Sequence, residues 1–145
     1  LLTYIVAFAG FNSSYFGEHS KVIGEAFYDG FGEAMEYVKD VDYDVIYITN
    51  HTQGENSWWV SEPLALFHHQ IDALYFQGKA QAYSKNGKKL LPYKERYKYV
   101  DFKDIKLSPA QNAVYIVHND EIGKFDKNAY IIKKFSTYNA VIPKR

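Results

Sequence analysis

The sequence contains no cysteine, which excludes disulfide bonds and thiolate metal sites. Basic and acidic side chains balance at 17 each, so the formal net charge is zero. A general nucleic-acid-binding protein carries a basic surface, and we therefore expect no nucleic-acid partner. The sequence also lacks an apolar run of the roughly 20 residues that a membrane-spanning helix needs. We expect this chain by itself to be soluble.

The 145 residues correspond to a single domain. The chain begins at Leu1 and its one methionine is Met35, so we interpret it as a piece of a longer protein. Its opening stretch, LLTYIVAFAGF, is largely apolar but too short to cross a bilayer. The stretch predicts either a strand over residues 1–9 or the last turns of a membrane helix.

Aromatic residues are abundant, at 18% of the chain, with 14 tyrosines among them. Tyrosine suits half-wet surfaces such as interfaces and sugar sites, although genome composition is an equal explanation. The basic side chains cluster in one part of the sequence. This run predicts a solvated loop or, as the sharper alternative, a contact with anionic lipid headgroups. Its members are Lys85, Lys88, Lys89, Lys94, Arg96 and Lys98.

Apolar residues recur at spacings of three and four between residues 20 and 39, which predicts an amphipathic helix. Gly24, Gly30 and Gly32 interrupt this pattern, and glycine is unfavourable inside a helix. We therefore expect the regular part of the helix over residues 30–39, with Asp29 available as its cap. The glycines are expected to mark close packing or a bend.

The β-branched run VIYIT, Val45–Thr49, predicts a buried strand. Ser61 and Pro63 predict the start of a second helix, because proline is accepted in a first turn. The remaining expectations are an inner helix face of Leu64, Phe67, His68 and Ile71, an extended piece at 73–76, a turn at Asn86-Gly87, strands at 97–102, 113–117 and 129–135, and an edge strand at 138–142.

This order of elements predicts an α/β fold, a small three-layer domain with a central mixed, mainly parallel sheet. Ligands of such sheets gather at the carboxyl ends of the strands. His51 and His118 each lie just past the carboxyl end of a predicted strand. We therefore expect the two histidines at one edge of the sheet.

The loop NHTQGENSWW, residues 50–59, follows the first buried strand and carries two adjacent indoles. Indole rings can stack on sugar faces, and the neighbouring polar side chains can bind hydroxyl groups. Two alternatives are packing of the loop against the next helix and contact with another part of a larger protein. The candidate ligand-binding residues are Asn50, His51, Gln53, Glu55, Trp58, Trp59 and His118.

A metal-dependent hydrolase built on His51, Glu55 and His118 is a further hypothesis, since these residue types can bind zinc. The three residues are not linked by any ligand-spacing motif, and we predict no resident metal or cofactor. No phosphate-binding loop and no nucleophile elbow is present. Nucleotide binding and serine hydrolysis therefore lack their usual sequence marks.

Three segments together resemble a known family: GFGEA at residues 30–34, YDVIYIT at residues 43–49, and a later segment with Leu66, Phe67, His68, Asp72, Ala73 and Phe76. They resemble the soluble extracytoplasmic C-terminal tail of bacterial membrane glycosyltransferases of the protein-mannosyltransferase and aminoarabinose-transferase-like class. His68 and Ala73 depart from the tyrosine and proline usual there. The resemblance covers roughly residues 11–80.

The resemblance implies a parent enzyme at the extracytoplasmic face of the cell membrane that uses a polyprenyl-phosphate sugar. In that family catalysis depends on acidic residues of the membrane-embedded half, so the resemblance carries no catalytic residue onto this chain. The implied partners are that half of the same polypeptide and an acceptor glycan, lipid or peptide. The alternative is a self-sufficient carbohydrate- or peptide-binding module that uses the Trp58-Trp59 loop.

Overall fold

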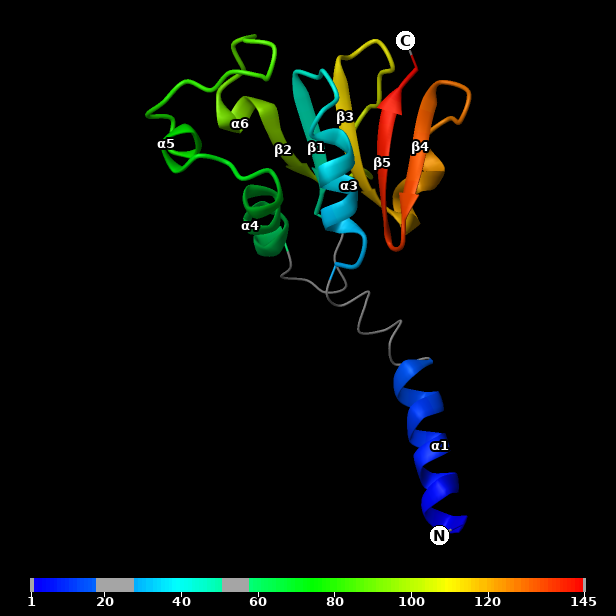
Figure 1. Cartoon of the computed structure of the whole chain (residues 1–145). Helices are drawn as coiled ribbons and strands as arrows, with labels where there is room; N and C mark the ends of the chain where they lie inside the picture. Colours follow the sequence, from blue (N-terminus) through cyan, green and yellow to red (C-terminus); the bar gives the residue numbers. More distant parts are fainter. Residues whose placement is uncertain (1, 18–27, 51–57, 145) are drawn as a thin grey trace.

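The computed structural model describes residues 2–17, 28–50 and 58–144, which form a mixed α/β domain with one helix set apart from it (Figure 1). The elements of the domain are α3 (Phe31–Val38), β1 (Val45–Thr49), α4 (Trp58–His68), α5 (Ala73–Phe76), α6 (Tyr93–Arg96), β2 (Tyr97–Val100), β3 (Ala113–His118), the 3₁₀ helix η1 (Asn119–Lys124), β4 (Tyr130–Phe135) and β5 (Tyr138–Pro143). The separate helix is α1 (Leu2–Phe16).

The five strands form one sheet in the order β2-β1-β3-β5-β4. β1 pairs in parallel with β2 and with β3, whereas β5 runs antiparallel to β3 and β4. The sheet is therefore mixed, as expected, but the expectation of a mainly parallel sheet is wrong. β5 is also not the expected edge strand, because the hairpin from β4 places it between β4 and β3.

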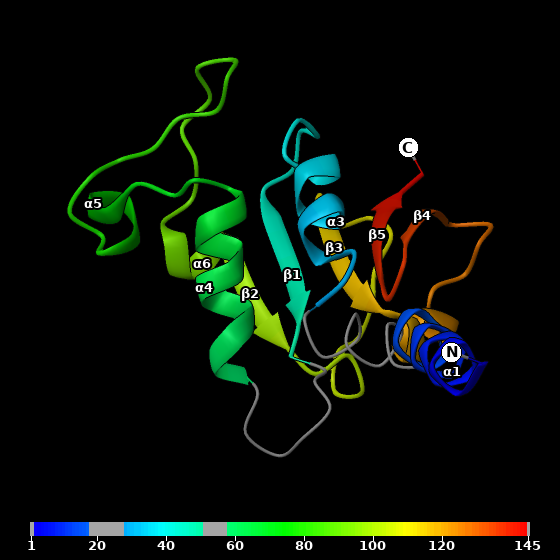
Figure 2. The same cartoon turned by 60° about the horizontal axis from the view of Figure 1, so that its bottom comes forward.

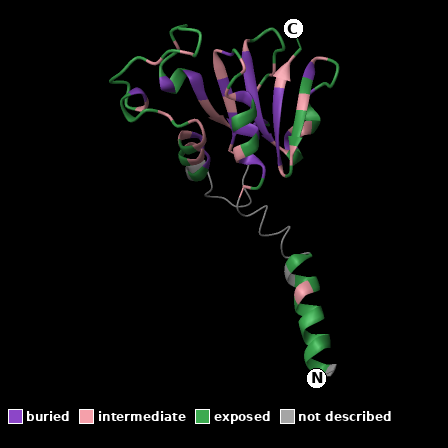
Figure 3. Ribbon diagram, in the orientation of Figure 1, coloured by how far each residue is buried: buried purple, intermediate pink, exposed green. Residues whose placement is uncertain are grey.

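Alternating side chains of the strands supply a core on each face of the sheet, as the two-residue period of a strand requires. Ile46, Ile48 and Ile116 face α3 and α4, which lie side by side over this face (Figure 2). Tyr115 and Val117 face the other way. There they pack with Phe125, directly after η1, and with Phe102 of the connection of residues 101–112. Figure 3 shows the buried residues concentrated along the strands.

The predicted strand over residues 1–9 is wrong, because these residues belong to α1. A short apolar run does not distinguish a strand from a helix by its periodicity, and no neighbouring strand pairs with it. α1 lies apart from the sheet, with Tyr4 73% and Val6 66% exposed (Figure 1). Within the part of the chain that the structure describes, no helix is both long and apolar enough to cross a membrane.

Three further local expectations are wrong in whole or in part. Residues 73–76 form the short helix α5, because the Asp72 carboxylate caps it by accepting the N–H groups of Leu74 and Tyr75 at 2.8 and 3.1 Å. On the expected inner face, Leu64 and Ile71 do pack against the core, but Phe67 is 75% exposed, and Ser61 and Ala65 are the buried residues of α4. The helix begins at Trp58, ahead of the predicted start, and encloses Pro63.

Gly30 and Gly32 confirm the expected close packing around α3. Gly30 has φ 85°, and a Cβ there would lie 2.0 Å from the carbonyl oxygen of Phe135. At Gly32 a Cβ would lie 2.4 Å from the His68 ring. Gly30 itself is the N-cap of α3, so Asp29 does not cap the helix as expected. The glycines let α3 approach the β4–β5 hairpin and α4.

We predict that Gly30→Ala lowers the free energy of unfolding clearly more than Gly78→Ala. Both positions have positive φ, 85° and 72°, so each substitution carries left-handed strain, roughly 1–2 kcal/mol. Only at Gly30 would the new methyl group meet backbone, since nothing lies within 4 Å of it at Gly78. Urea unfolding of the two variants measures the difference. Equal losses would contradict the close approach of α3 to Phe135.

His69 joins α3, α4 and β2 through both ring nitrogens. Nε2 lies 2.9 Å from the Met35 carbonyl oxygen, which can only accept, so Nε2 carries the hydrogen. Nδ1 lies 2.9 Å from the Tyr97 hydroxyl and accepts its hydrogen. Both nitrogens are therefore committed in the neutral ring, and burial lowers the pKa of His69.

Because the pKa of His69 is depressed in the folded state, the unfolded chain takes up a proton first as the pH falls. The stability contributed by neutral His69 is therefore complete above about pH 6.5 and decreases as the pH falls below that value. We expect an NMR titration of the His69 ring to have its midpoint below 6.5. A midpoint at or above 6.5 would contradict a neutral ring with both nitrogens hydrogen-bonded.

Candidate functional site

The parallel strands β2, β1 and β3 end at one edge of the sheet, which we call the carboxyl edge. Asn50 directly follows β1, and its N–H donates to the Val100 carbonyl at the end of β2, at 2.8 Å. His118 is the last residue of β3, the other neighbour of β1. The structure thus places Asn50 and His118 at one edge, whereas the expectation that His51 lies beside His118 stays a prediction, because His51 is outside the described residues.

Most of the candidate loop lies outside the described residues. His51, Gln53 and Glu55 belong to residues 51–57, which the structure does not describe. Trp58 and Trp59 are the first two residues of α4, and their side chains are likewise outside the description. The ligand-binding role of these five residues and the zinc hypothesis of His51, Glu55 and His118 stay predictions.

His118 serves as the N-cap of η1. Its Nδ1 accepts the Asp120 N–H at 3.3 Å and lies 3.3 Å from a carboxylate oxygen of the same residue. The imidazole also meets the Tyr138 ring edge-on, with centroids 5.5 Å apart. His118 thus has a structural role at the carboxyl edge, where the sequence predicted a ligand-binding role for it.

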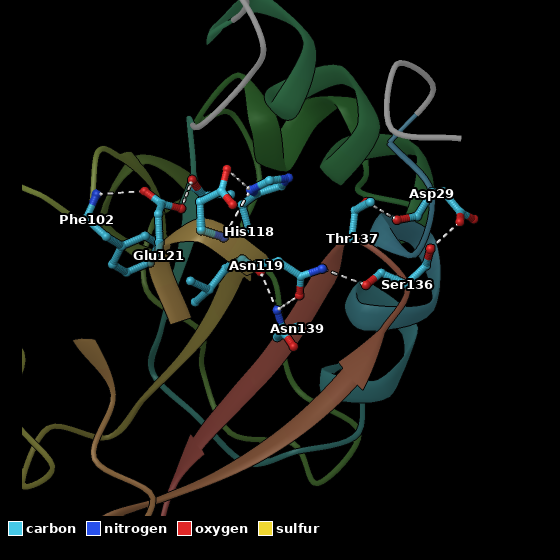
Figure 4. Close-up of polar contacts among 11 residues, drawn as sticks. Asp29, Phe102, His118, Asn119, Glu121, Ser136, Thr137 and Asn139 are labelled. Atoms are coloured by element: carbon cyan, nitrogen blue, oxygen red, sulfur yellow. Dashed lines mark hydrogen bonds and ion pairs between the residues drawn. The ribbon is translucent and has the colours of Figure 1, made fainter. Parts of the chain in front are cut away.

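A buried glutamate, Glu121, is the functional group that the sequence reasoning missed. It is 5% exposed, and its carboxylate accepts the Thr49 hydroxyl at 2.6 Å and the Phe102 N–H at 3.4 Å (Figure 4). The Ser61 hydroxyl donates to the Thr49 carbonyl at 3.1 Å, which brings α4 into the same network. Glu121 therefore connects η1, β1 and the chain after β2.

A second network at this edge holds the β4–β5 hairpin (Figure 4). Asn139 is fully buried and donates to Asn119 Oδ1 at 2.9 Å, while Asn119 donates to the Ser136 carbonyl at 2.8 Å. The Ser136 hydroxyl donates to the Asp29 carboxylate, and the Thr137 hydroxyl to the Asp29 carbonyl at 2.5 Å. The chain entering α3 is thus fastened to the hairpin.

The chemistry available at the carboxyl edge is that of a hydrogen-bonded junction. Both oxygens of the Glu121 carboxylate are engaged by protein donors, and Lys124 donates to the Phe102 carbonyl at 2.5 Å beside it. Among residues 2–17, 28–50 and 58–144, no three His, Asp or Glu side chains gather closely enough to hold a metal ion.

One sequence signal points to Glu121. It lies in the stretch His-Asn-Asp-Glu directly after the buried strand β3, where a polar group at the carboxyl end of a strand is a candidate. Its partner Thr49 is 72 residues away in the sequence, so the pairing itself carries no local pattern.

Comparison with protein-family models, with curated proteins and with solved structures finds no significant match to this chain.

We predict that Glu121→Ala lowers the free energy of unfolding by about 2–3 kcal/mol, because it removes the buried carboxylate that accepts from the Thr49 hydroxyl and the Phe102 N–H. Glu121→Gln should cost less, since the amide oxygen can accept from Phe102 and the Thr49 hydroxyl can turn to accept. Chemical denaturation measures both variants.

Glu95→Ala is the matched control, because Glu95 is an exposed glutamate of α6. Its removal is expected to change stability by less than about 0.5 kcal/mol. A loss in Glu121→Ala no larger than that of the control would remove Glu121 from its role in the junction.

Proposed function

We propose that the chain is a non-catalytic extracytoplasmic domain of a membrane glycosyltransferase that uses a polyprenyl-phosphate sugar. In this proposal the sheet, its helical cover and its η1 cover form the three layers of one domain. The domain contacts the acceptor or covers the active face of the membrane-embedded half of the same polypeptide. The observation that carries the proposal is the apolar, exposed helix α1.

α1 contains no charged residue over its 15 positions. Apolar side chains are distributed around it, and Tyr4, Ile5, Val6 and Phe8 are all more than half exposed. A helix that is apolar all round is stable when it is buried in protein or surrounded by lipid. At about 1.5 Å per residue α1 is about 22 Å long, shorter than the roughly 30 Å core of a bilayer. These properties favour a membrane or a membrane protein as the surroundings of α1.

The route of the chain supports an orientation. The domain's first segment, with Asp29, is fastened to Thr137 at the carboxyl edge. The same edge carries Asn50, the first residue of the candidate loop, and His118, the last residue of β3. In the proposed orientation this edge faces the membrane-embedded half, where the reaction takes place. Acceptor contact through residues 50–59 follows from that orientation.

One observation favours the second candidate, a carbohydrate- or peptide-binding module. Trp58 and Trp59 begin α4, and Ser61 of the same turn is bonded to the end of β1 at 3.1 Å. This bond fixes the start of α4 at the carboxyl edge, where ligands of parallel strands gather. A module of this kind would bind a soluble oligosaccharide or peptide without any membrane.

We expect the chain to float with phospholipid vesicles in a density gradient. A double substitution, Ile5→Glu and Phe8→Glu, should reduce the floating fraction at least about tenfold, because a carboxylate in the apolar part of a bilayer costs several kcal/mol. Phe67→Glu is the control, since Phe67 is an aromatic residue outside α1 that is 75% exposed, against 55% for Ile5 and 54% for Phe8.

Two outcomes separate the candidates. Loss of flotation in the α1 variant, with normal flotation of the Phe67 variant, supports the membrane-attached domain. A wild-type chain that stays in the soluble fraction contradicts it. If that soluble chain shows a saturable tryptophan-fluorescence change with cell-wall oligosaccharides, and Trp59→Ala abolishes the change, the second candidate is favoured.

A further inference from the structure

A pocket of about 310 Å³ lies at the end of the sheet opposite the carboxyl edge. One wall is the connection of residues 39–43 between α3 and β1, and the other is the hairpin around Asn86-Gly87. The expected turn there is confirmed, with Gly87 at φ 76°. Arg96, Tyr97 and His69 line the inner part of the pocket. Its volume is in the range of small-molecule sites.

Arg96 is the unusual group in this pocket, because it is a guanidinium only 8% exposed. Nη1 donates to the carbonyl oxygens of Tyr43 and Asp44 at 2.8 and 3.2 Å, and the guanidinium carbon lies 4.3 Å above the Tyr43 ring. The Tyr43 and Tyr97 side chains beside the guanidinium are neutral, so they supply it with no negative charge. A buried cation without a charged partner is costly, so a ligand that supplied one would be bound favourably.

The carboxylates near Arg96 are already paired with lysines. Asp40 is bonded to Lys85, while Lys88 lies 2.7 Å from an oxygen of Asp44 and 3.6 Å from one of Asp42. Within the described residues, Arg96 forms no ion pair with any carboxylate. The charged side chains that line the pocket are Lys39, Lys85, Arg96, Asp40 and Asp42, an excess of positive charge.

We propose that this pocket binds the carboxylate or phosphate group of a small molecule, with Arg96 as the anchor. The planar fork of an arginine matches the oxygens of either group and binds them more strongly than it binds a neutral carbonyl. Lys85 reaches the same space from the hairpin, and the Tyr83 ring, 61% exposed, offers a face for the remainder of the ligand. The site lies away from α1 and does not depend on the function proposed above.

Other parts of the described chain give weaker support for an additional binding site. A larger depression, of about 590 Å³, borders the same connection, but its one charged lining residue is Asp42 and its other lining is mainly apolar. In the basic run considered for lipid headgroups, Lys85 and Lys88 pair with aspartates and Arg96 is buried, so half of its six residues do not form an open basic surface. The Arg96 pocket is therefore the strongest candidate for an additional site.

The test titrates the chain with glucuronate, glucose 6-phosphate, inorganic phosphate and neutral glucose, in the absence of lipid. NMR follows the Arg96 Nε–Hε signal, and calorimetry gives the Kd. We expect saturable binding of glucuronate or of the phosphates, at least about tenfold tighter than glucose, as one charge-assisted bond would provide. Which anion binds best distinguishes a carboxylate ligand from a phosphate ligand.

Two hairpin variants keep the test independent of the folding role of Arg96. Lys85→Gln should weaken anion binding several-fold, because it removes a pocket charge and leaves Asp40 without its lysine. Lys89→Gln removes the same charge from an exposed position that does not line the pocket, and should leave binding unchanged. Arg96→Lys, which keeps the charge but loses the fork, should weaken binding about tenfold.

Three results would overturn the proposal: no saturable change at Arg96 with any anion, glucose bound as tightly as glucuronate, or equal weakening by the Lys85 and Lys89 variants. The second result would indicate a neutral sugar site, and the third a general effect of charge. None of these results depends on whether the chain floats with vesicles, so the failure of one proposal leaves the other standing.

Discussion

The central position of β1 determines where the other elements of the domain lie. β1 is paired in parallel on both sides, so its two ends are also the two ends of the parallel half of the sheet. Arg96 is bonded to the chain entering β1, and Glu121 is bonded to Thr49 at its last residue. Five residues of strand thus separate a buried cation from a buried carboxylate. The proposed anion pocket and the proposed membrane-facing edge are the surroundings of these two groups.

The sequence was informative where the pattern is local. β1, β3 and β4 are close to their predicted bounds, because a short β-branched run between polar residues has few other solutions. The same argument failed for residues 2–16, where an apolar run without a period is compatible with either a strand or a helix. The position of β5 depends on its pairing with β4 in a hairpin. The residues of a single strand do not determine the order of strands in a sheet. The site residues illustrate the same limit, since Arg96 meets Tyr43 across 53 positions and Glu121 meets Thr49 across 72.

The high tyrosine content has a physical explanation in the fold. Several tyrosines belong to the core and use their hydroxyls as internal partners. Tyr93 and Tyr99 bond each other at 2.9 Å, and the Tyr75 hydroxyl donates to the Leu91 carbonyl at 2.5 Å. Burial raises the pKa of Tyr93, Tyr97 and Tyr99, so these hydroxyls stay protonated as donors. Tyrosine therefore packs the interior of this domain as well as its surface. Composition alone had suggested only interfaces and sugar sites.

The fastening of Asp29 to the β4–β5 hairpin has a mechanical consequence. Any tension that α1 transmits along the chain reaches Asp29 and Gly30 before it reaches the hydrogen bonds of α3. At that point the force is shared with Ser136 and Thr137, which form the turn between β4 and β5, 107 and 108 residues later in the sequence. The β4–β5 hairpin therefore resists a force applied from the α1 side. The force is distributed over the antiparallel half of the sheet and does not act on α3 alone.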